Sequence, residues 1–150
     1  MQTLAGQVVV FSFGGEDYGL PIGQVQEIIR HTRPRSIASV VPWVLGVINL
    51  RGRIVPVCDL GVRFGIGGGA GPDGAAGPGE DAKIVIVESA SGVAGIVVAD
   101  VSEVLTLAES EVEPLPAAGG DCRRGIAKVG ERLIALLDPD LLLSGVAGAA

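Results

Sequence analysis

The sequence predicts a mostly β protein made of two small β-barrels side by side, with a few short helices. Aliphatic residues must form the core, because hydrophobic residues make up 48% of the 150 residues and aromatic residues only 3%. Many of these aliphatics are β-branched, which favours strands. The apolar runs are short and separated by glycine and proline turns, which is typical of all-β barrels and sandwiches. A glycine-rich break divides the runs into two groups, which favours two small barrels over one large barrel.

The first group of runs begins with a strand over residues 7–13, which a pair of glycines ends. The chain then stays extended up to Pro21, since proline disfavours helical geometry at the residue before it. Beyond this proline, Val25, Ile28 and Ile29 recur at spacings of three and four. This spacing predicts a short amphipathic helix.

A hairpin is expected in the middle of the first half. Residues 44–50 and 53–60 are two apolar runs that only Arg51 and Gly52 separate. Gly52 can take the positive φ that such a tight turn requires. Pro56 has no amide hydrogen to donate, so the second strand is expected to be an edge strand or to carry a bulge there.

Residues 65–80 predict a flexible loop, because half of them are glycine and none of them can build a core. After this loop the apolar runs predict strands over residues 83–88, 93–99, 101–107, 125–129 and 132–137. The alternation within 101–107 is imperfect, which indicates burial on both faces of that strand. Residues 111–116 are expected to form a loop, since two prolines interrupt them.

The end of the chain predicts one more short helix. Asp138 is a suitable N-cap, and Pro139 is suited to the first helical position. Residues 145–150 are expected to fray. The whole chain, residues 1–150, is expected to form a single domain of two β-barrel lobes.

Charge and composition limit the classes of partner. The net charge of −6 argues against nucleic acid as a partner, because phosphates attract basic surfaces. No apolar run approaches the roughly 18 residues that span a bilayer, and no leader-like segment opens the chain. Two cysteines are too few for a disulfide scaffold. We therefore expect a cytoplasmic protein that does not insert into membranes directly.

Residues that commonly carry catalysis or bind cofactors form no recognisable site in the sequence, since the plentiful carboxylates are scattered over loops. Residues 65–70 match a G-x-G-x-x-A dinucleotide pattern, but Pro72 prevents the helix that would hold a pyrophosphate. The only histidine, His31, lies in a basic loop, and Cys58 and Cys122 lie at no ligand-like spacing. We therefore expect no catalysis, no cofactor and no metal. A small β-barrel enzyme or ligand binder stays open, because fold alone does not determine function.

The most specific pattern in the chain is W-V-L-G-V-I-N-L-R-G-R-I-V-P-V-C-D-L at residues 43–60. Further blocks lie in order on either side, at residues 11–13, 18–22, 25–28, 83–88, 93–98, 101–105, 113–116 and 133–138. Together they resemble the CheW family of chemotaxis coupling proteins over nearly the whole chain. The resemblance implies two SH3-like β-barrels and no catalysis. It also implies an adaptor that joins the cytoplasmic tip of chemoreceptors to the regulatory domain of the CheA histidine kinase.

The resemblance also implies which residues meet these partners. Those that bind the receptor would be Val25, Glu27, Gly46, Arg51 and Gly95, and those that couple to the kinase would be Ile84 and Val104. Arg51 at a hairpin tip could reach a partner carboxylate, and Gly46 would let a receptor helix approach closely. Simpler explanations stay open: turn geometry for Gly46, an exposed cation for Arg51 and core packing for Val25. The kinase-facing surface is expected on the second barrel, near the strands after residue 83.

Two other roles within this kind of protein stay open from sequence. One is a coupling protein of a non-flagellar chemosensory pathway, with pilus motility or another output. The other is the adaptor half of a fusion with a phosphorylatable receiver domain. The chain ends soon after its last predicted helix, which speaks against the fusion.

Overall fold

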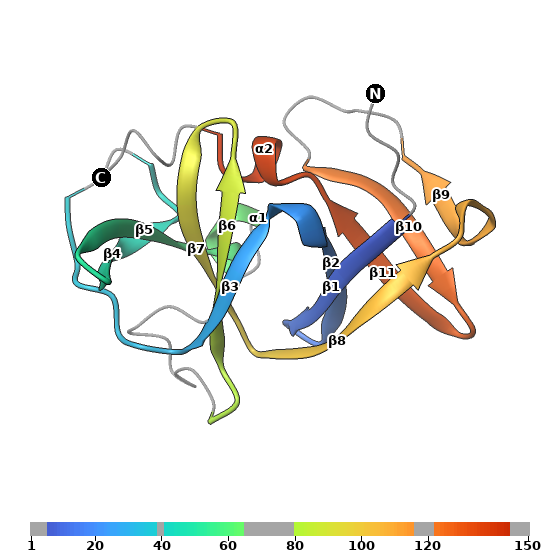
Figure 1. Ribbon diagram of the computed structural model, residues 1–150, viewed down its shortest axis with the longest axis horizontal. Helices are drawn as coiled ribbons and strands as arrows, with labels where there is room; N and C mark the ends of the chain where they lie inside the picture. The colour runs from blue at the N-terminus through green and yellow to red at the C-terminus, as the bar shows by residue number, and fades with distance from the viewer. Residues whose placement is uncertain (1–5, 39–40, 65–79, 116–121, 145–150) are drawn as a thin grey trace.

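Two β-sheets lie side by side in the computed structural model, which describes residues 6–38, 41–64, 80–115 and 122–144 (Figure 1). We call the part built on the six-stranded sheet lobe 1 and the part built on the five-stranded sheet lobe 2. In Figure 1, lobe 2 is on the left and lobe 1 on the right. The predicted fold class, mostly β with short helices, is confirmed.

The elements are as follows, with the strands in the order in which neighbours pair. Lobe 1 contains β8 (Asp100–Leu107), β1 (Gly6–Phe13), β2 (Glu16–Pro21), β11 (Arg132–Leu137), β10 (Arg123–Val129) and β9 (Val112–Pro114). Lobe 2 contains β3 (Val25–Arg30), β6 (Lys83–Ser89), β7 (Gly92–Val98), β5 (Arg53–Asp59) and β4 (Val44–Leu50). The short helices are η1 (Ile22–Gln24), α1 (Leu60–Phe64), η2 (Glu109–Glu111) and α2 (Pro139–Leu142).

The two lobes share one arrangement of strands. In lobe 1, edge strand β8 pairs with the β1–β2 hairpin, and β2 runs parallel to β11 of the β10–β11 hairpin. In lobe 2, β3 pairs with the β6–β7 hairpin, and β7 runs parallel to β5 of the β4–β5 hairpin. The edge strands are exchanged: β3 follows the lobe 1 hairpin but joins lobe 2, and β8 follows the lobe 2 hairpin but joins lobe 1.

The register of the two edge strands shows that the lobes share a backbone irregularity. Glu27 on β3 pairs with Ile86, and Glu103 on β8 pairs with Val10 at the matching position of lobe 1. A shift in register lies beside each glutamate, on the side of the preceding valine. The same positions of both lobes therefore carry the same backbone irregularity.

Buried apolar side chains gather in three groups. The interior of lobe 1 holds Val8, Val10, Leu107, Ala127, Ile134 and Leu136. The interior of lobe 2 holds Ile48, Val55, Val57, Ile84, Ile86 and Val97. The third group fills the seam between the lobes and includes Phe11, Tyr18, Leu20, Val85, Ile96, Cys58, Cys122 and Leu142. Because β6 and β7 border both this seam and the interior of lobe 2, most of their residues are buried on both faces.

The segment after Pro21 differs from the predicted amphipathic helix. Only Ile22–Gln24 forms a helical turn, and Val25–Arg30 is strand β3, antiparallel to β6. So short a segment makes a weak helix in water, whereas the edge of β6 offers it a ladder of backbone hydrogen bonds. The spacing was misleading because Ile28, one of the three apolar residues, is 40% exposed on the outer face.

Two expectations for the second half also need correction. Residues 111–116 are not only a loop, because Val112–Pro114 forms β9 and pairs with β10. The proline is tolerated because it ends a strand at the edge of the sheet. Strand β8 is not buried on both faces, since Ser102, Glu103 and Val104 are exposed. It is one of the two edge strands of lobe 1, and these three residues are open to solvent.

The predicted β4–β5 hairpin is confirmed, but β5 is not an edge strand, because it pairs with both β4 and β7. The bulge lies opposite, in β4, between Val44 and Gly46. Pro56 pairs with Val47 on the β4 side only, and the ladder with β7 begins one residue later, at Val57. The missing amide hydrogen therefore interrupts no ladder.

The last predicted helix is confirmed as α2. The Asp138 carboxylate accepts hydrogen bonds from the backbone nitrogens of Asp140 (2.9 Å) and Leu141 (3.4 Å), and Pro139 opens the helix. This is the capping geometry that the residue types predict. Two further expectations lie outside the described residues. They are the flexible loop at 65–80, of which only Glu80 is described, and the fraying of 145–150.

Candidate functional site: a Glu–Arg pair that joins the edges of lobe 2

Glu27 and Arg51, two of the residues that the sequence implicates, form a bidentate ion pair on lobe 2. Arg51 Nη1 donates to Glu27 Oε2 over 2.8 Å, and Nη2 donates to Oε1. The pair joins the tip of the β4–β5 hairpin to β3, and β3 and β4 are the two edge strands of the sheet. The Arg51 side chain is still 67% exposed. A guanidinium has five N–H donors, so donors remain for a partner carboxylate.

The turn that presents Arg51 has an unusual backbone. Arg51 has φ 52° and Gly52 has φ 84°, so both central residues lie in the left-handed region. The Asn49 side-chain oxygen accepts a hydrogen bond from the Gly52 nitrogen over 2.8 Å, which supports the turn. A hairpin turn of two residues needs these positive φ values, and glycine or asparagine usually supplies the first of them. An arginine there carries conformational strain, a feature that clusters at functional sites.

Gly46 lies beneath the chain's own backbone and is buried. The segment after β3 forms an isolated bridge to β4, in which Arg35 and Val47 exchange both backbone hydrogen bonds, at 2.7 and 2.9 Å. This bridge links the two edges of the lobe 2 sheet and closes it into a barrel. A Cβ at Gly46 would overlap the Arg35 carbonyl oxygen and lie 2.6 Å from its carbon. The close approach at Gly46 is therefore made by Arg35.

Gly95 and Ile84 face each other inside lobe 2. Both residues are buried, and a Cβ at Gly95 would lie 2.7 Å from Ile84 Cγ2 and 3.4 Å from Ile86 Cδ1. Gly95 also pairs with Val57 of β5, at the parallel ladder of this lobe. These two residues therefore set the packing under the β4–β5 hairpin, and neither is on the surface.

Val25 and Val104 lie apart from the Glu–Arg pair. Val25 is half-buried and packs against the seam between the lobes. Val104 is on the edge strand of lobe 1 and is 49% exposed. The structure therefore brings Glu27 and Arg51 together on the surface and Ile84 and Gly95 together in the core, and it separates both groups from Val104.

Lobe 1 carries a counterpart of the pair that sequence reasoning missed. Arg132 donates to Glu103 over 2.7 Å and to Asp17 over 3.2 Å, which ties the β10–β11 hairpin to β8 and β2. The carboxylates raise the pKa of Arg132, chiefly through the hydrogen bond that Arg132 donates to Glu103 and then through the one that it donates to Asp17. The signal in the sequence was the similarity between V-Q-E-I-I at 25–29 and V-S-E-V-L at 101–105.

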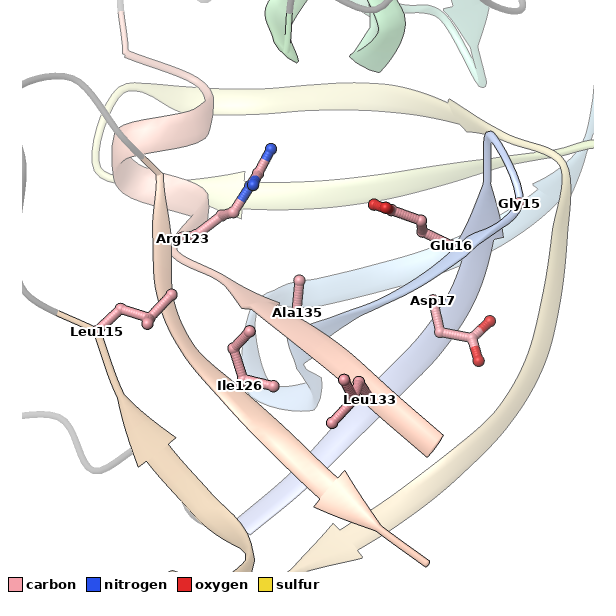
Figure 2. A pocket seen from close by; sticks show the side chains of 8 residues that line it. All are labelled: Gly15, Glu16, Asp17, Leu115, Arg123, Ile126, Leu133 and Ala135. Carbon is pink, nitrogen blue, oxygen red and sulfur yellow. The ribbon is translucent and has the colours of Figure 1, made fainter. Parts of the chain in front are cut away.

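A groove of about 390 Å³ opens on the surface of lobe 1 (Figure 2). Its lining residues are Gly15, Glu16, Asp17, Leu115, Arg123, Ile126, Leu133 and Ala135. Leu133 is 61% exposed, and Glu16 and Arg123 stand at the end of the groove that lies nearer the seam in Figure 2. The guanidinium of Arg123 also lies over the ring of Phe64, 5.2 Å from its centroid. The groove therefore combines an apolar floor with charged ends, which suits the side chains of another protein.

The raised pKa of Tyr18, which lies next to this groove, predicts that the folded protein loses stability in alkali. Burial, and then the hydrogen bond that its hydroxyl donates to Glu16, raise the pKa of Tyr18 from 10.0 to about 12. The unfolded tyrosine therefore loses its proton before the folded one, so the free energy of unfolding should fall as the pH rises from 10 towards about 12. Urea unfolding across this range measures the fall. The Tyr18→Phe variant is the control, and its free energy of unfolding should fall less steeply with pH. An equally steep fall in the variant and the native protein would contradict the prediction.

Side chains that commonly bind metals are not clustered in the part of the chain that the structure describes. No group of three or more His, Cys, Asp or Glu side chains there could hold a metal ion. His31 is half-buried rather than fully solvated, and burial lowers its pKa. Cys58 and Cys122 are buried, and burial raises the pKa of the Cys58 thiol to about 12. None of the helices among these residues is long and apolar enough to cross a membrane.

The fold and the site define a two-lobed β domain whose exposed groups suit protein binding. A family model described as CheW-like domain matches residues 7–147. The chain is 33% identical over 147 residues to the chemotaxis protein CheW of Klebsiella aerogenes, with 95% of this chain and 84% of that protein covered. It is 30% identical over 138 residues to CheW of Rhizobium meliloti, with 89% and 84% covered.

A solved structure agrees with these relatives. The crystal structure of the scaffolding protein TtCheW from Thermoanaerobacter tengcongensis matches with a TM-score of 0.80 at 32% identity, and the match covers 99% of this chain and 94% of that chain. The chain therefore belongs to the CheW family. The two SH3-like lobes that the resemblance implied are confirmed.

Proposed function

We propose that this protein is a non-catalytic adaptor that couples chemoreceptors to a CheA-type histidine kinase in chemotaxis. The family match across residues 7–147 carries this proposal, because it spans both lobes and includes the Glu27–Arg51 pair. The adaptor works in the cytoplasm, next to receptors that are themselves in the membrane. It needs no cofactor, since its task is to hold two proteins together.

The receptor's cytoplasmic tip binds lobe 2 at the Glu27–Arg51 pair. The exposed guanidinium offers donors to a receptor carboxylate or to carbonyls at a helix end, and the neighbouring carboxylate orients it. Gly46, Gly95 and Ile84 are buried, so they act as positioning residues that hold the β4–β5 hairpin in place. Val25 acts in the same way, by fixing β3 against the seam.

The regulatory domain of the kinase binds a different surface. Strands β6 and β7 offer it little, because most of their residues are buried. Among β6, β7 and β8, the strand with the most exposed residues is β8, where Val104 faces solvent. We place the coupling role of Val104 there, on lobe 1, and we assign Ile84 an indirect role through packing.

Purified protein is expected to bind the regulatory domain of a CheA-type kinase from its own organism. A modest interface gives a Kd in the micromolar range, which corresponds to about −8 kcal/mol. Isothermal titration calorimetry measures this affinity, and the catalytic domain of the same kinase serves as the control. If no such regulatory domain binds, the adaptor role is wrong. Binding to the kinase of a pilus or other non-flagellar system alone would assign the protein to that pathway.

A further inference from the structure

The two halves of the chain, residues 6–64 and 80–144, are interleaved rather than assigned one to each lobe. The first half supplies hairpin β1–β2 to lobe 1, and edge strand β3 and hairpin β4–β5 to lobe 2. The second half supplies hairpin β6–β7 to lobe 2, and edge strand β8 and hairpin β10–β11 to lobe 1. Each half thus inserts one hairpin between an edge strand and a hairpin of the other half.

The halves are also equivalent to each other position by position. Residues 8–31 correspond to 84–107 without a gap, so that Gly19 matches Gly95. Gly19 pairs with Val10 across its hairpin, and Gly95 pairs with Ile86, which is the residue that corresponds to Val10. Residues 46–60 correspond to 125–139, and each stretch contains an aspartate that receives a backbone N–H bond at the start of a short helix. Over these stretches the two halves therefore repeat one structural unit, and residues 65–79 connect the halves in sequence.

The contacts between the halves are extensive and of two kinds. Four ladders cross between them: β1 with β8, β2 with β11, β3 with β6, and β5 with β7. All three apolar groups also take side chains from both halves. Separating the halves would break four ladders, leave an unpaired edge on eight strands and divide every core, which is the situation of an obligate complex.

We propose that noncovalent contacts alone hold the two halves together, so that they stay assembled when the connection between them is cut. The two half-chains are stable only as a pair, and neither lobe is a separate unit of stability. The Glu27–Arg51 pair depends on this assembly, although both residues belong to the first half. Hairpin β6–β7 of the second half separates β3 from β5 and sets the distance between them.

The test uses the full-length chain with a site for a specific protease placed within residues 65–79. The protein is purified intact, cleaved while folded, and analysed by native size-exclusion chromatography and far-UV circular dichroism. We expect both fragments to elute together at the position of the uncut chain, with an unchanged β-sheet spectrum. Dilution should separate them only below about 1 µM, because four ladders and three shared apolar groups join the halves, as in an obligate complex.

Thermal unfolding provides the second readout. Cleavage turns an intramolecular contact into a bimolecular one, so the midpoint of the cut protein should rise with concentration. The uncut protein with the inserted site is the matched control, and its midpoint should not depend on concentration. The proposal would be overturned if the fragments separated on the column at a concentration 10-fold above the dilution limit of about 1 µM given above. Loss of the β-sheet signal on cleavage alone would also overturn it. Partner binding is not part of either readout, so such a result leaves the adaptor role untouched.

Discussion

The Arg51→Glu variant is expected to lose binding to the receptor's cytoplasmic tip while its fold stays intact. The substitution removes the exposed guanidinium and places a second carboxylate beside Glu27, so that the surface repels an acidic partner. We expect affinity to fall at least about tenfold, equivalent to about 1.4 kcal/mol. The thermal midpoint should change little, since an exposed ion pair contributes only about 0–1 kcal/mol to stability. A receptor pull-down and a thermal melt measure the two effects.

Two companion variants separate the roles of charge and pairing. Arg53→Glu changes the charge by the same amount on the same hairpin but leaves the Glu27–Arg51 pair intact, so it should bind nearly as the native protein does. The charge swap that combines Glu27→Arg with Arg51→Glu restores an ion pair with reversed polarity. Continued loss of binding in the swap would show that Arg51 meets the receptor itself. Normal pull-down by Arg51→Glu would remove Arg51 from the site.

The Gly46→Ala variant is expected to lose about 3 kcal/mol of unfolding free energy, which is near the upper end for an overpacked site. The added methyl group overlaps the Arg35 carbonyl and lies 3.1 Å from the Ser36 Cα. These are backbone atoms, so no side-chain rotation relieves the contact. The bridge between Arg35 and Val47 must open instead, and with it the closure of lobe 2. Urea unfolding followed by circular dichroism measures the loss.

The control for this prediction is Gly23→Ala. Gly23 has no neighbouring atom within 4 Å of an added Cβ, and its φ is not positive, so the change should have little effect. The loss in Gly46→Ala should also weaken receptor binding, because the displaced β4 carries the hairpin that presents Arg51. Equal stability of the two variants would show that the segment around Arg35 moves aside at little cost.

Local features of this fold were predictable from sequence, and the β4–β5 hairpin shows why. The turn at Arg51 and Gly52 depends on φ preferences of adjacent residues, and the capping of α2 depends on Asp138 and the residues just after it. Both involve contacts between near neighbours in the chain. The prediction at residues 25–30 was wrong for the opposite reason. Its helical spacing competed with an open edge of β6, which lies far away in the sequence.

The candidate site was predictable in part. Glu27 and Arg51 were both named from the resemblance, but nothing in the sequence showed that they bind each other, since they are 24 positions apart. Turn geometry, the simpler explanation for Gly46, was also incomplete, because the Arg35 backbone is what leaves no room for a side chain there. The lobe 1 cluster of Arg132, Asp17 and Glu103 was missed because its members come from three separate strands.

By itself the sequence determined the family, the mostly β composition, most strands and the short-range turns and caps, because these depend on residue type and near neighbours. Only the tertiary structure decided that the halves interleave, that Arg35 closes lobe 2 over Gly46, and that Arg51 turns back to Glu27. These features depend on which strand edges are free to pair and on which side chains then meet. Pairing of that kind joins residues far apart in the chain, and no local pattern encodes it.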